Sequence, residues 1–491
     1  MTAMESVVIE KPALSTEQLG AVASTIAVPA YDREHVEIGI VHLGPGAFHR
    51  AHQAWVFDQA LATDPRWGIS EVALKSSGLR GALAPQDGLY TVAILGASSR
   101  YRVIGAVREM LVASEDPQRV IQRLSAATTK IVTLTITEKG YCLDGSGALD
   151  ANHVDIVADL AQPDRPASAI GYLVAGLRMR RDAGLPAYSV ISCDNLSNNG
   201  RKLRDAVIAL AGLQDAALAD WIAQNVAFPR TMVDSIVPAT DDALRSRVAS
   251  ATGLHDRWPV QREPFLQWVI ADEFCNEVPD WRALGVTITD DVAAYESAKL
   301  RLLNGAHSSL AYIGLLRGHR SVSDAMADMP LAAWLRRLMI DDIRPAVRVP
   351  AGMDVDAYID AVLERFRNPA IHHELAQIAW DGSQKLPFRL LATIAEALDA
   401  GRSIDRLAVP IAAWMQFVRG KARDDRKLTD PLAERLLGIA DACTGDARAD
   451  VTAFLDVDAL FPTALRDDGR FVDALITAHA ALTHDVETAL H

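Results

Sequence analysis

Cysteine, aromatic residues and positive charge are all scarce in this chain. Its 491 residues include four cysteines and 6% aromatic residues, and 49 Lys and Arg face 63 Asp and Glu, giving a net charge of -14. The cysteines lie far apart without a C-x-x-C pair, which predicts free thiols rather than a disulfide framework or a zinc site. The negative charge argues against nucleic acid or an anionic membrane surface as a partner.

Long apolar runs are absent as well. Stretches such as 407–418 are too short to span a bilayer, and residues 1–20 contain no apolar core of a signal peptide. We therefore expect a cytoplasmic protein that acts on a small molecule. With 50% hydrophobic and 23% charged residues the composition is that of an ordinary globular protein, and the length predicts about two domains.

The first part of the chain alternates strand-like and helical patterns. After a polar arm at 1–35, apolar or β-branched runs predict strands, and a helical pattern at 167–182 lies between two of them. Such alternation predicts an α/β fold with a mostly parallel, doubly wound, Rossmann-like sheet. The expected strands are 38–43, 69–74, 101–106, 130–136 and 187–193.

After about residue 290 the strand-like clusters give way to Ala-, Leu- and Arg-rich helical patterns. The sequence therefore predicts a Rossmann-like dinucleotide-binding domain at 1–290 and a mainly α-helical substrate or catalytic domain at 291–491. Whether the protein is a monomer or a homodimer stays open. The expected helices are 294–317, 330–341, 355–367, 370–380, 386–400, 405–419, 430–442 and 470–489, with loops at 342–354 and 420–430.

A glycine turn follows the first strand. Gly44 and Gly46 come directly after an apolar run and before a helical pattern, the context of a dinucleotide site. Gly44 permits the turn, Gly46 lets a pyrophosphate approach, and the helix N-terminus supplies N–H groups. The third glycine of the usual fingerprint is replaced by His49, so a plain strand–helix turn stays open. Arg50 either contacts the phosphates or is a solvated surface residue.

The choice between NAD and NADP also stays open at this stage. An acidic residue at the end of the second strand normally binds the ribose hydroxyls of NAD. Residues 74–80 contain no such acid, and Glu71 lies three residues too early. Lys75, Ser76 and Arg80 would tolerate a 2′-phosphate.

The helical pattern at 294–317 carries three polar residues suited to chemistry. At ~100° per residue, Lys299, Asn304 and His307 fall at roughly 0°, 140° and 80°, within half the circumference of a helix. The amine can accept a proton, the amide can stabilise an oxyanion, and the imidazole can orient a hydroxyl. The alternative is a helix with half-exposed polar residues.

Several sequence blocks resemble the polyol-specific long-chain dehydrogenase family over about residues 36–485. The resemblance implies NAD(P)-linked interconversion of an alcohol and a ketone without a metal. The blocks are 44–53, 135–142, 192–196, 228–234, 263–268, the 299/304/307 helix and 381–387.

The resemblance also implies roles for individual residues. Lys299 would be the general acid/base, with Glu296 on its path for protons to solvent. Asn304 and Asn195 would form the oxyanion pair, and His307 would orient the reacting oxygen. The substrate pocket would include Val233, Asp234, Gln377 and Lys385, and the cofactor would contact Gly44, Gly46, Ala47, Phe48 and Arg50.

Some of these residues have plain structural alternatives. Asp234 is also typical of a turn, and Lys385 and Arg389 are typical of solvated helix ends. The run His372-His373-Glu374 resembles a metal motif, but a surface helix start is favoured because no third ligand can be placed.

Position 377 bears on the substrate. Mannitol-type members of the family resemble each other in carrying Arg there, whereas members acting on a sugar acid tend to carry Gln, as in Gln377. Ser235 stands where many members have Arg. The resemblance thus favours D-mannonate and D-fructuronate, with D-mannitol and D-fructose, or another polyol such as D-arabinitol, as alternatives.

Two hypotheses from other classes remain. A nucleotide-binding protein without catalysis would bind the cofactor but not turn over a substrate. A hydrolase is disfavoured because no Gly-x-Ser-x-Gly elbow is present, and Gly145-Ser146-Gly147 lacks its spacing.

Overall fold

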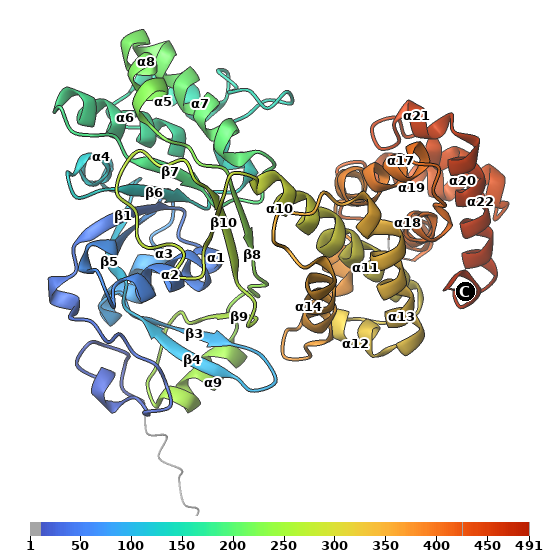
Figure 1. Cartoon of the computed structure of the whole chain (residues 1–491), viewed down its shortest axis with the longest axis horizontal. Coiled ribbons are helices and arrows are strands. Elements are labelled where there is room, and N and C mark those ends of the chain that lie inside the picture. The colour runs from blue at the N-terminus through green and yellow to red at the C-terminus, as the bar shows by residue number, and fades with distance from the viewer. Residues whose placement is uncertain (1–10, 425, 491) are drawn as a thin grey trace, which may run out of the picture. The chain divides into compact units, whose positions relative to one another are not determined.

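The computed structural model describes residues 11–424 and 426–490, and the first ten residues of the expected N-terminal arm lie outside this part. Internal contacts divide the chain into two compact units, Met1–Val292 (unit 1) and Ala293–His491 (unit 2). Each unit is described by itself (Figure 1). Among the described residues, no helix combines the length and apolarity needed to cross a membrane.

Unit 1 contains a five-stranded parallel sheet with the order β5-β2-β1-β6-β7. Because β2 pairs on one side of β1 and β6 on the other, the strand order reverses at β1. The strands are β1 (Ile38–Leu43), β2 (Gly68–Ala73), β5 (Val107–Val112), β6 (Ile131–Leu134) and β7 (Ser189–Ser192).

Alternate residues of the central strands are buried on opposite faces of this sheet. Val41 and Val132 pack into one apolar cluster, whereas Ile40 and Ile131 pack into another together with Phe57. Both faces are therefore covered, as a doubly wound parallel sheet requires. The covering helices include α2 (Gln53–Ala60) on one face and α4 (Pro117–Ser125), α6 (Ala169–Asp182) and α7 (Asn199–Gln214) on the other.

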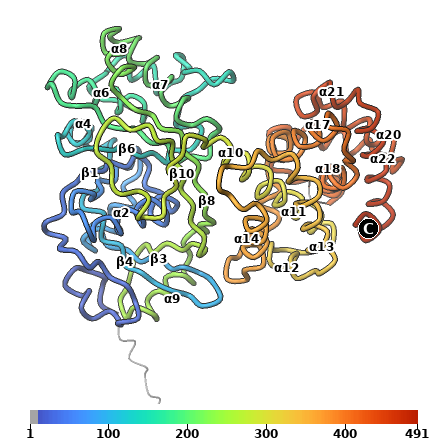
Figure 2. Tube along the Cα trace, viewed as in Figure 1, coloured from blue at the N-terminus to red at the C-terminus, as the bar shows by residue number. Residues whose placement is uncertain are grey.

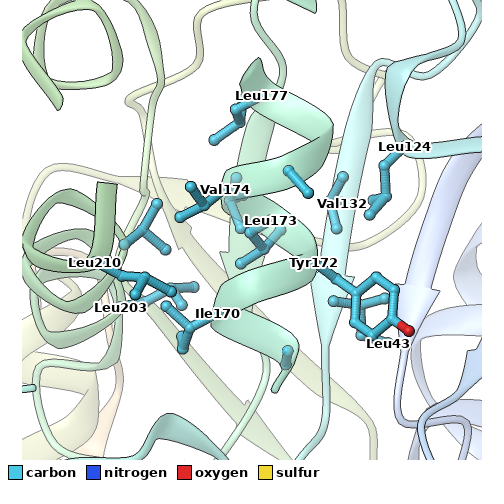
Figure 3. Close-up of a cluster of buried hydrophobic side chains, with 14 of the residues drawn as sticks. Leu43, Leu124, Val132, Ile170, Tyr172, Leu173, Val174, Leu177, Leu203 and Leu210 are labelled. Carbon is cyan, nitrogen blue, oxygen red and sulfur yellow. The ribbon is translucent and has the colours of Figure 1, made fainter. Parts of the chain in front are cut away.

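Helix α6 lies at the centre of the first cluster (Figure 3). Its Tyr172 and Leu173 face Leu43 and Val132 of the sheet, and all four side chains are buried. On its other side Ile170 lies near Leu203 of α7. This packing fixes the two central strands whose carboxyl ends form the candidate cofactor site.

Two three-stranded sheets complete unit 1, with the orders β4-β3-β9 and β11-β10-β8. Figure 1 shows β3 and β9 side by side, although they lie far apart in the sequence. Their strands are β3 (Tyr90–Ile94), β4 (Arg100–Ile104), β8 (Thr231–Asp234), β9 (Val260–Arg262), β10 (Gln267–Ala271) and β11 (Thr287–Thr289). The remaining helices are α1 (Ala47–Ala51), α3 (Gly78–Leu83), α5 (Val154–Ala161), α8 (Ala216–Asn225) and α9 (Asp242–Thr252).

Unit 2 is helical and is built around α18 (Asp405–Arg423), which packs against α11 (Ala306–Leu316), α19 (Ala433–Ala442) and α22 (Gly469–His484). Figure 2 shows α18 next to α22. The other α-helices are α10 (Val292–Ala298), α12 (Val322–Ala327), α13 (Met329–Arg337), α14 (Val355–Arg367), α15 (Leu375–Ile378), α16 (Gly382–Leu386), α17 (Ala392–Asp399), α20 (Ala447–Leu455) and α21 (Thr463–Arg466).

The predicted fold class, a Rossmann-like α/β part followed by a helical part, is confirmed. Three predicted helices contain π-helical segments instead of being regular throughout: η6 (Lys299–Gly305), η7 (Leu338–Ile343) and η9 (Pro387–Leu391). The helix predicted at 370–380 is reduced to α15, and α12, α20 and α21 lie outside the predicted helices. The π segments matter most, because two of them carry candidate site residues.

Candidate active site

The glycine turn lies at the carboxyl end of β1, where the strand order of the sheet reverses. Gly44 has φ +87°, and a Cβ on it would lie 2.3 Å from the carbonyl oxygen of Thr135, so this position requires glycine. The Gly46 amide donates to the Gly44 carbonyl over 2.8 Å and closes the turn. For a Cβ added to Gly46 the nearest heavy atom is that carbonyl oxygen, at 4.0 Å. The turn therefore leaves room for a phosphate at a topological switch point.

The helix after the turn is shorter than the sequence suggests. Helix α1 has only five residues and ends at Ala51, and the φ of -117° and ψ of -81° of His52 separate it from α2. Ala47 and Phe48 stand half-buried at its start, and the Phe48 ring stacks on His52 with centroids 4.9 Å apart. A helix of five residues contributes only a small dipole at the glycine turn.

Arg50 points into unit 1. It is 2% exposed, its Nη1 donates to the Trp258 carbonyl over 2.7 Å, and its guanidinium lies 5.3 Å from the centroid of the Tyr90 ring. The alternative of a solvated surface arginine is wrong. The expected phosphate contact gains no support from this geometry, because the side chain is held by neighbours in the core.

Buried titratable side chains lie beneath the turn. His49, in place of the third fingerprint glycine, stacks on His42 with ring centroids 3.3 Å apart, and its Nε2 lies 3.5 Å from Oε1 of Glu71. Burial raises the pKa of Glu71 to about 7 and lowers the pKa of His49 well below its usual value. With 1% exposure, Glu71 is a core residue rather than a ribose ligand.

The loop after β7 is fixed by an aspartate that the sequence analysis passed over. The Asp194 carboxylate accepts the amides of Ile136 and Thr137 at 3.0 and 2.9 Å and the Tyr141 hydroxyl at 2.8 Å. It thereby ties this loop to the loop after β6. Asn195, the next residue, is exposed at the carboxyl edge of the sheet, the position where ligands of such sheets bind.

The expected substrate residues of unit 1 lie on β8. Val233 and Asp234 are both 5% exposed and pair with Trp268 and Gln267 of β10 in an antiparallel ladder. Asp234 is therefore the last residue of a buried strand, and the alternative of a turn residue is wrong.

In unit 2 the expected catalytic helix changes its geometry where the chemistry is expected. Residues Lys299 to Gly305 form π-helix η6 between α10 and α11. Because a π-helix bonds residue i to residue i+5, Lys299 and Asn304 lie closer to one face of the helix than they would in an α-helix. The separation of roughly 140° expected for an α-helix is therefore wrong, and the two side chains are better aligned than the sequence predicts.

His307 is held as a neutral imidazole on α11. Its ring stacks on Phe366 at 5.0 Å and meets His373 edge-on at 4.8 Å. Burial is the largest cause that lowers its pKa well below the usual value, followed by the charges of His373, Arg389, Arg365 and Lys385. A neutral imidazole can both donate and accept a hydrogen bond, which suits it to orienting a substrate hydroxyl. Glu296 stands half-buried on α10, three residues before Lys299.

Two cations follow α15 on neighbouring helical segments. Lys385, at the end of α16, is half-buried and its Nζ donates to the Ile378 carbonyl at 3.4 Å, and burial lowers its pKa. Arg389, in η9, donates from Nη1 to the Ser308 hydroxyl over 2.9 Å. Both are cations in the last turn of their helical segment, as the alternative states, but neither is fully solvated. Gln377, by contrast, is exposed on α15.

Sequence reasoning missed His373. Its neighbour His372 is exposed and pairs with Glu374 at 2.7 Å, as a surface residue would, but the His373 ring turns inward to His307. Alternation of exposure within a short turn produces this difference, and the sequence alone carried no signal for it.

One group of possible metal ligands occurs in the described part of the chain, away from these residues. Ligand atoms of Cys142, His153 and Asp155 lie within 4.8 Å of one another. Nδ1 of His153 accepts the amide of Asp155 at 3.2 Å, and Asp155 lies 3.9 Å from the Lys75 ammonium. The acceptor nitrogen and the carboxylate thus already have partners within the protein.

Family models match nearly the whole chain. Residues 38–283 match the mannitol dehydrogenase Rossmann domain, and residues 291–483 match the mannitol dehydrogenase C-terminal domain.

Curated relatives and solved structures agree with these matches. The chain is 41% identical to the D-mannonate oxidoreductase of Escherichia coli K12, covering 93% of this chain and 96% of that protein. It is 39% identical to a mannitol 2-dehydrogenase of Phaeosphaeria nodorum, covering 94% and 82%. The mannitol 2-dehydrogenase of Pseudomonas fluorescens, solved with NAD and D-mannitol, superposes with a TM-score of 0.82 at 38% identity, covering 97% of this chain and 98% of that one.

Proposed function

The chain belongs to the mannitol dehydrogenase family, and from this premise we propose that it is a metal-independent, NAD-dependent oxidoreductase. It interconverts a secondary alcohol and a C2 ketone in a six-carbon polyol or sugar acid. D-mannonate and D-fructuronate are the first substrate pair of this proposal. The observation that supports the chemistry most is the π-helical turn that aligns Lys299 with Asn304.

Residues 1–290 are the proposed dinucleotide-binding domain. Gly44, Gly46, Ala47 and Phe48 would hold the cofactor, because the turn is closed on itself and still open around Gly46. When bound, NAD accepts the hydride of the alcohol, and NADH returns it to the ketone. The Lys75 side chain is 79% exposed beyond β2 and would tolerate the 2′-phosphate of NADP. NADP is therefore the second cofactor to be tested.

Residues 291–491 are the proposed substrate and catalytic domain. Lys299 takes the proton of the reacting hydroxyl, and Glu296, three residues before it, passes that proton to solvent. Asn304 donates a hydrogen bond to the oxygen as it becomes negative, and its place near the same face of η6 as Lys299 suits this role. The neutral His307 orients the same hydroxyl. In the ketone direction Lys299 returns the proton.

Further residues enter the proposal by resemblance. Asn195 would be the second amide donor to the oxyanion, a role consistent with its exposure at the carboxyl edge of the sheet. The substrate pocket would include Val233, Asp234, Gln377 and Lys385.

The second candidate pair is D-mannitol and D-fructose, followed by another polyol such as D-arabinitol. Its support is a mannitol 2-dehydrogenase relative nearly as similar as the D-mannonate oxidoreductase, at 39% against 41% identity. Gln377 favours the sugar acid by resemblance.

A panel of substrates and cofactors tests the proposal. Initial rates are measured for D-mannonate, D-mannitol and D-arabinitol with NAD and with NADP, and for D-fructuronate and D-fructose with the reduced cofactors. We expect the highest kcat/KM for D-mannonate with NAD. Binding of NAD without turnover of any polyol or aldonate would instead identify a non-catalytic nucleotide-binding protein.

A further inference from the structure

Basic side chains surround His307 in unit 2. The charges that act on this imidazole come from His373, Arg389, Arg365 and Lys385, and each opposes its protonation. A carboxylate could pair with the cations Lys385 and Arg389 of this group, whereas a neutral polyol carries no charge for them.

Lys385 and Arg389 are the two cations of this group on one continuous helical stretch. They are four residues apart, from the end of α16 into η9, a spacing at which like charges on a helix repel. Apart from burial, the Arg389 charge is the largest influence that lowers the pKa of Lys385, while Asp381 and Asp430 act in the opposite direction. An anion bound between the two cations would offset their repulsion.

Both cations keep hydrogen-bond donors available. Within the described part of the chain, the Arg389 guanidinium makes one hydrogen bond, from Nη1 to the Ser308 hydroxyl, and Lys385 makes one, to the Ile378 carbonyl. A guanidinium has five N–H donors in a planar fork that matches a carboxylate, and an ammonium has three. The anchored Arg389 is thus preorganised for a planar anion.

The position of Arg389 connects this pair to the proposed reacting centre. A Cβ added to Gly305, at the end of η6, would lie 2.9 Å from the Arg389 carbonyl oxygen, so the two π-helices touch. Asn304 precedes Gly305 directly. In D-fructuronate the ketone and the carboxylate lie toward opposite ends of the carbon chain. A carboxylate site on the helix next to η6, rather than on η6 itself, suits such a molecule.

We propose that Lys385 and Arg389 together bind the carboxylate of a sugar-acid substrate, with Arg389 as the residue that distinguishes the acid from a neutral polyol. This inference rests on the proposed function and names the residues behind its substrate class.

The test compares Arg389→Met with the wild type on D-mannonate and D-mannitol. The ratio of the two kcat/KM values should fall about 10- to 100-fold in the variant, the effect of losing charge-assisted hydrogen bonds. Arg389→Lys should fall in between, because it keeps the charge but loses the fork. The matched control is Arg448→Met on α20, where the arginine side chain is 70% exposed and the ratio should not change.

A binding measurement keeps the inference separate from the reaction. Thermal unfolding is followed with NADH, which cannot react with D-mannonate, in the presence of D-mannonate or D-mannitol. We expect D-mannonate to raise the midpoint of the wild type and to lose this effect in Arg389→Met. If Arg389→Met does not fold, Lys385→Met is measured in its place.

The outcomes separate the two proposals. Stabilisation by D-mannonate that depends on Arg389, without turnover of any substrate, would support the carboxylate site and overturn the proposed function. Turnover of neutral polyols alone, or an unchanged acid-to-polyol ratio in both Arg389→Met and Lys385→Met, would leave an oxidoreductase and overturn the carboxylate site. Neither turnover nor stabilisation would overturn both.

Discussion

Gly305→Ala perturbs the contact between the π-helices η6 and η9 of unit 2 without changing a polar side chain. A Cβ at this position would lie 2.9 Å from the Arg389 carbonyl oxygen, whereas ordinary contact begins at 3.4 Å. The helices η6 and η9 must therefore separate by about 0.5 Å, the difference between these two distances. Asn304, directly before Gly305, would move with η6.

The magnitude follows from two opposing effects on stability and one on rate. Overpacking costs about 1–3 kcal/mol, and replacing a helical glycine by alanine returns about 1 kcal/mol, so the net loss of stability is about 0–2 kcal/mol. A misplacement of ~1 Å costs about 100-fold in rate, which gives about 10-fold for half that shift. We expect kcat to fall about 10-fold while the thermal midpoint changes by only a few degrees.

Gly438→Ala on α19 is the matched control. Position 438 is exposed, and no atom lies within 4 Å of an added Cβ. This variant should be slightly more stable than the wild type and equally active. Saturation kinetics and thermal unfolding of both variants make the comparison. A wild-type kcat in Gly305→Ala would refute the view that contact between the π-helices positions the site.

Other predictions concern unit 1. Because the folded-state pKa of Glu71 is raised from 4.5 to about 7, its stabilising contribution is present below pH 4.5 and is lost as the pH rises to 7. Glu71→Gln should remove this pH dependence of the free energy of unfolding, which amounts to about 3 kcal/mol between pH 4.5 and 7. Urea unfolding of both proteins between about pH 4.5 and 8 measures it. His49 has the opposite sign below its usual pKa of 6.5 and lies 3.5 Å from Glu71, so the contribution of Glu71 is read above pH 6.5. Gly44→Ala should destabilise the protein and abolish NAD binding in a fluorescence titration, because its Cβ meets the Thr135 carbonyl; Gly46→Ala should retain the stability, and equal stability of both variants would contradict this view.

Much of the architecture follows from local patterns. The runs that predicted β1 and α14 give elements with the bounds expected, because alternation and helical spacing of apolar residues directly reflect burial. The glycine turn could be predicted because its backbone conformation requires glycine at position 44, and that glycine is visible in the sequence. The family resemblance named the candidate residues that pattern alone left open.

The remaining features depend on tertiary packing. The π-helix η6 contacts η9, and no propensity distinguishes such a turn from an α-helix. Arg50 and His373 turn inward although their neighbours in sequence suggest a surface, because aromatic and imidazole partners come from distant segments. Side-chain direction at such positions is decided by neighbours that the sequence pattern does not reveal.

Turnover of D-mannonate with NAD by Lys299→Ala tests the central claim, that the Lys299 amine transfers the proton in an NAD-linked alcohol oxidation. We expect kcat/KM to fall by several orders of magnitude while NAD binding is kept, and added methylamine to restore part of the rate by replacing the missing amine. Wild-type turnover in Lys299→Ala would contradict the account.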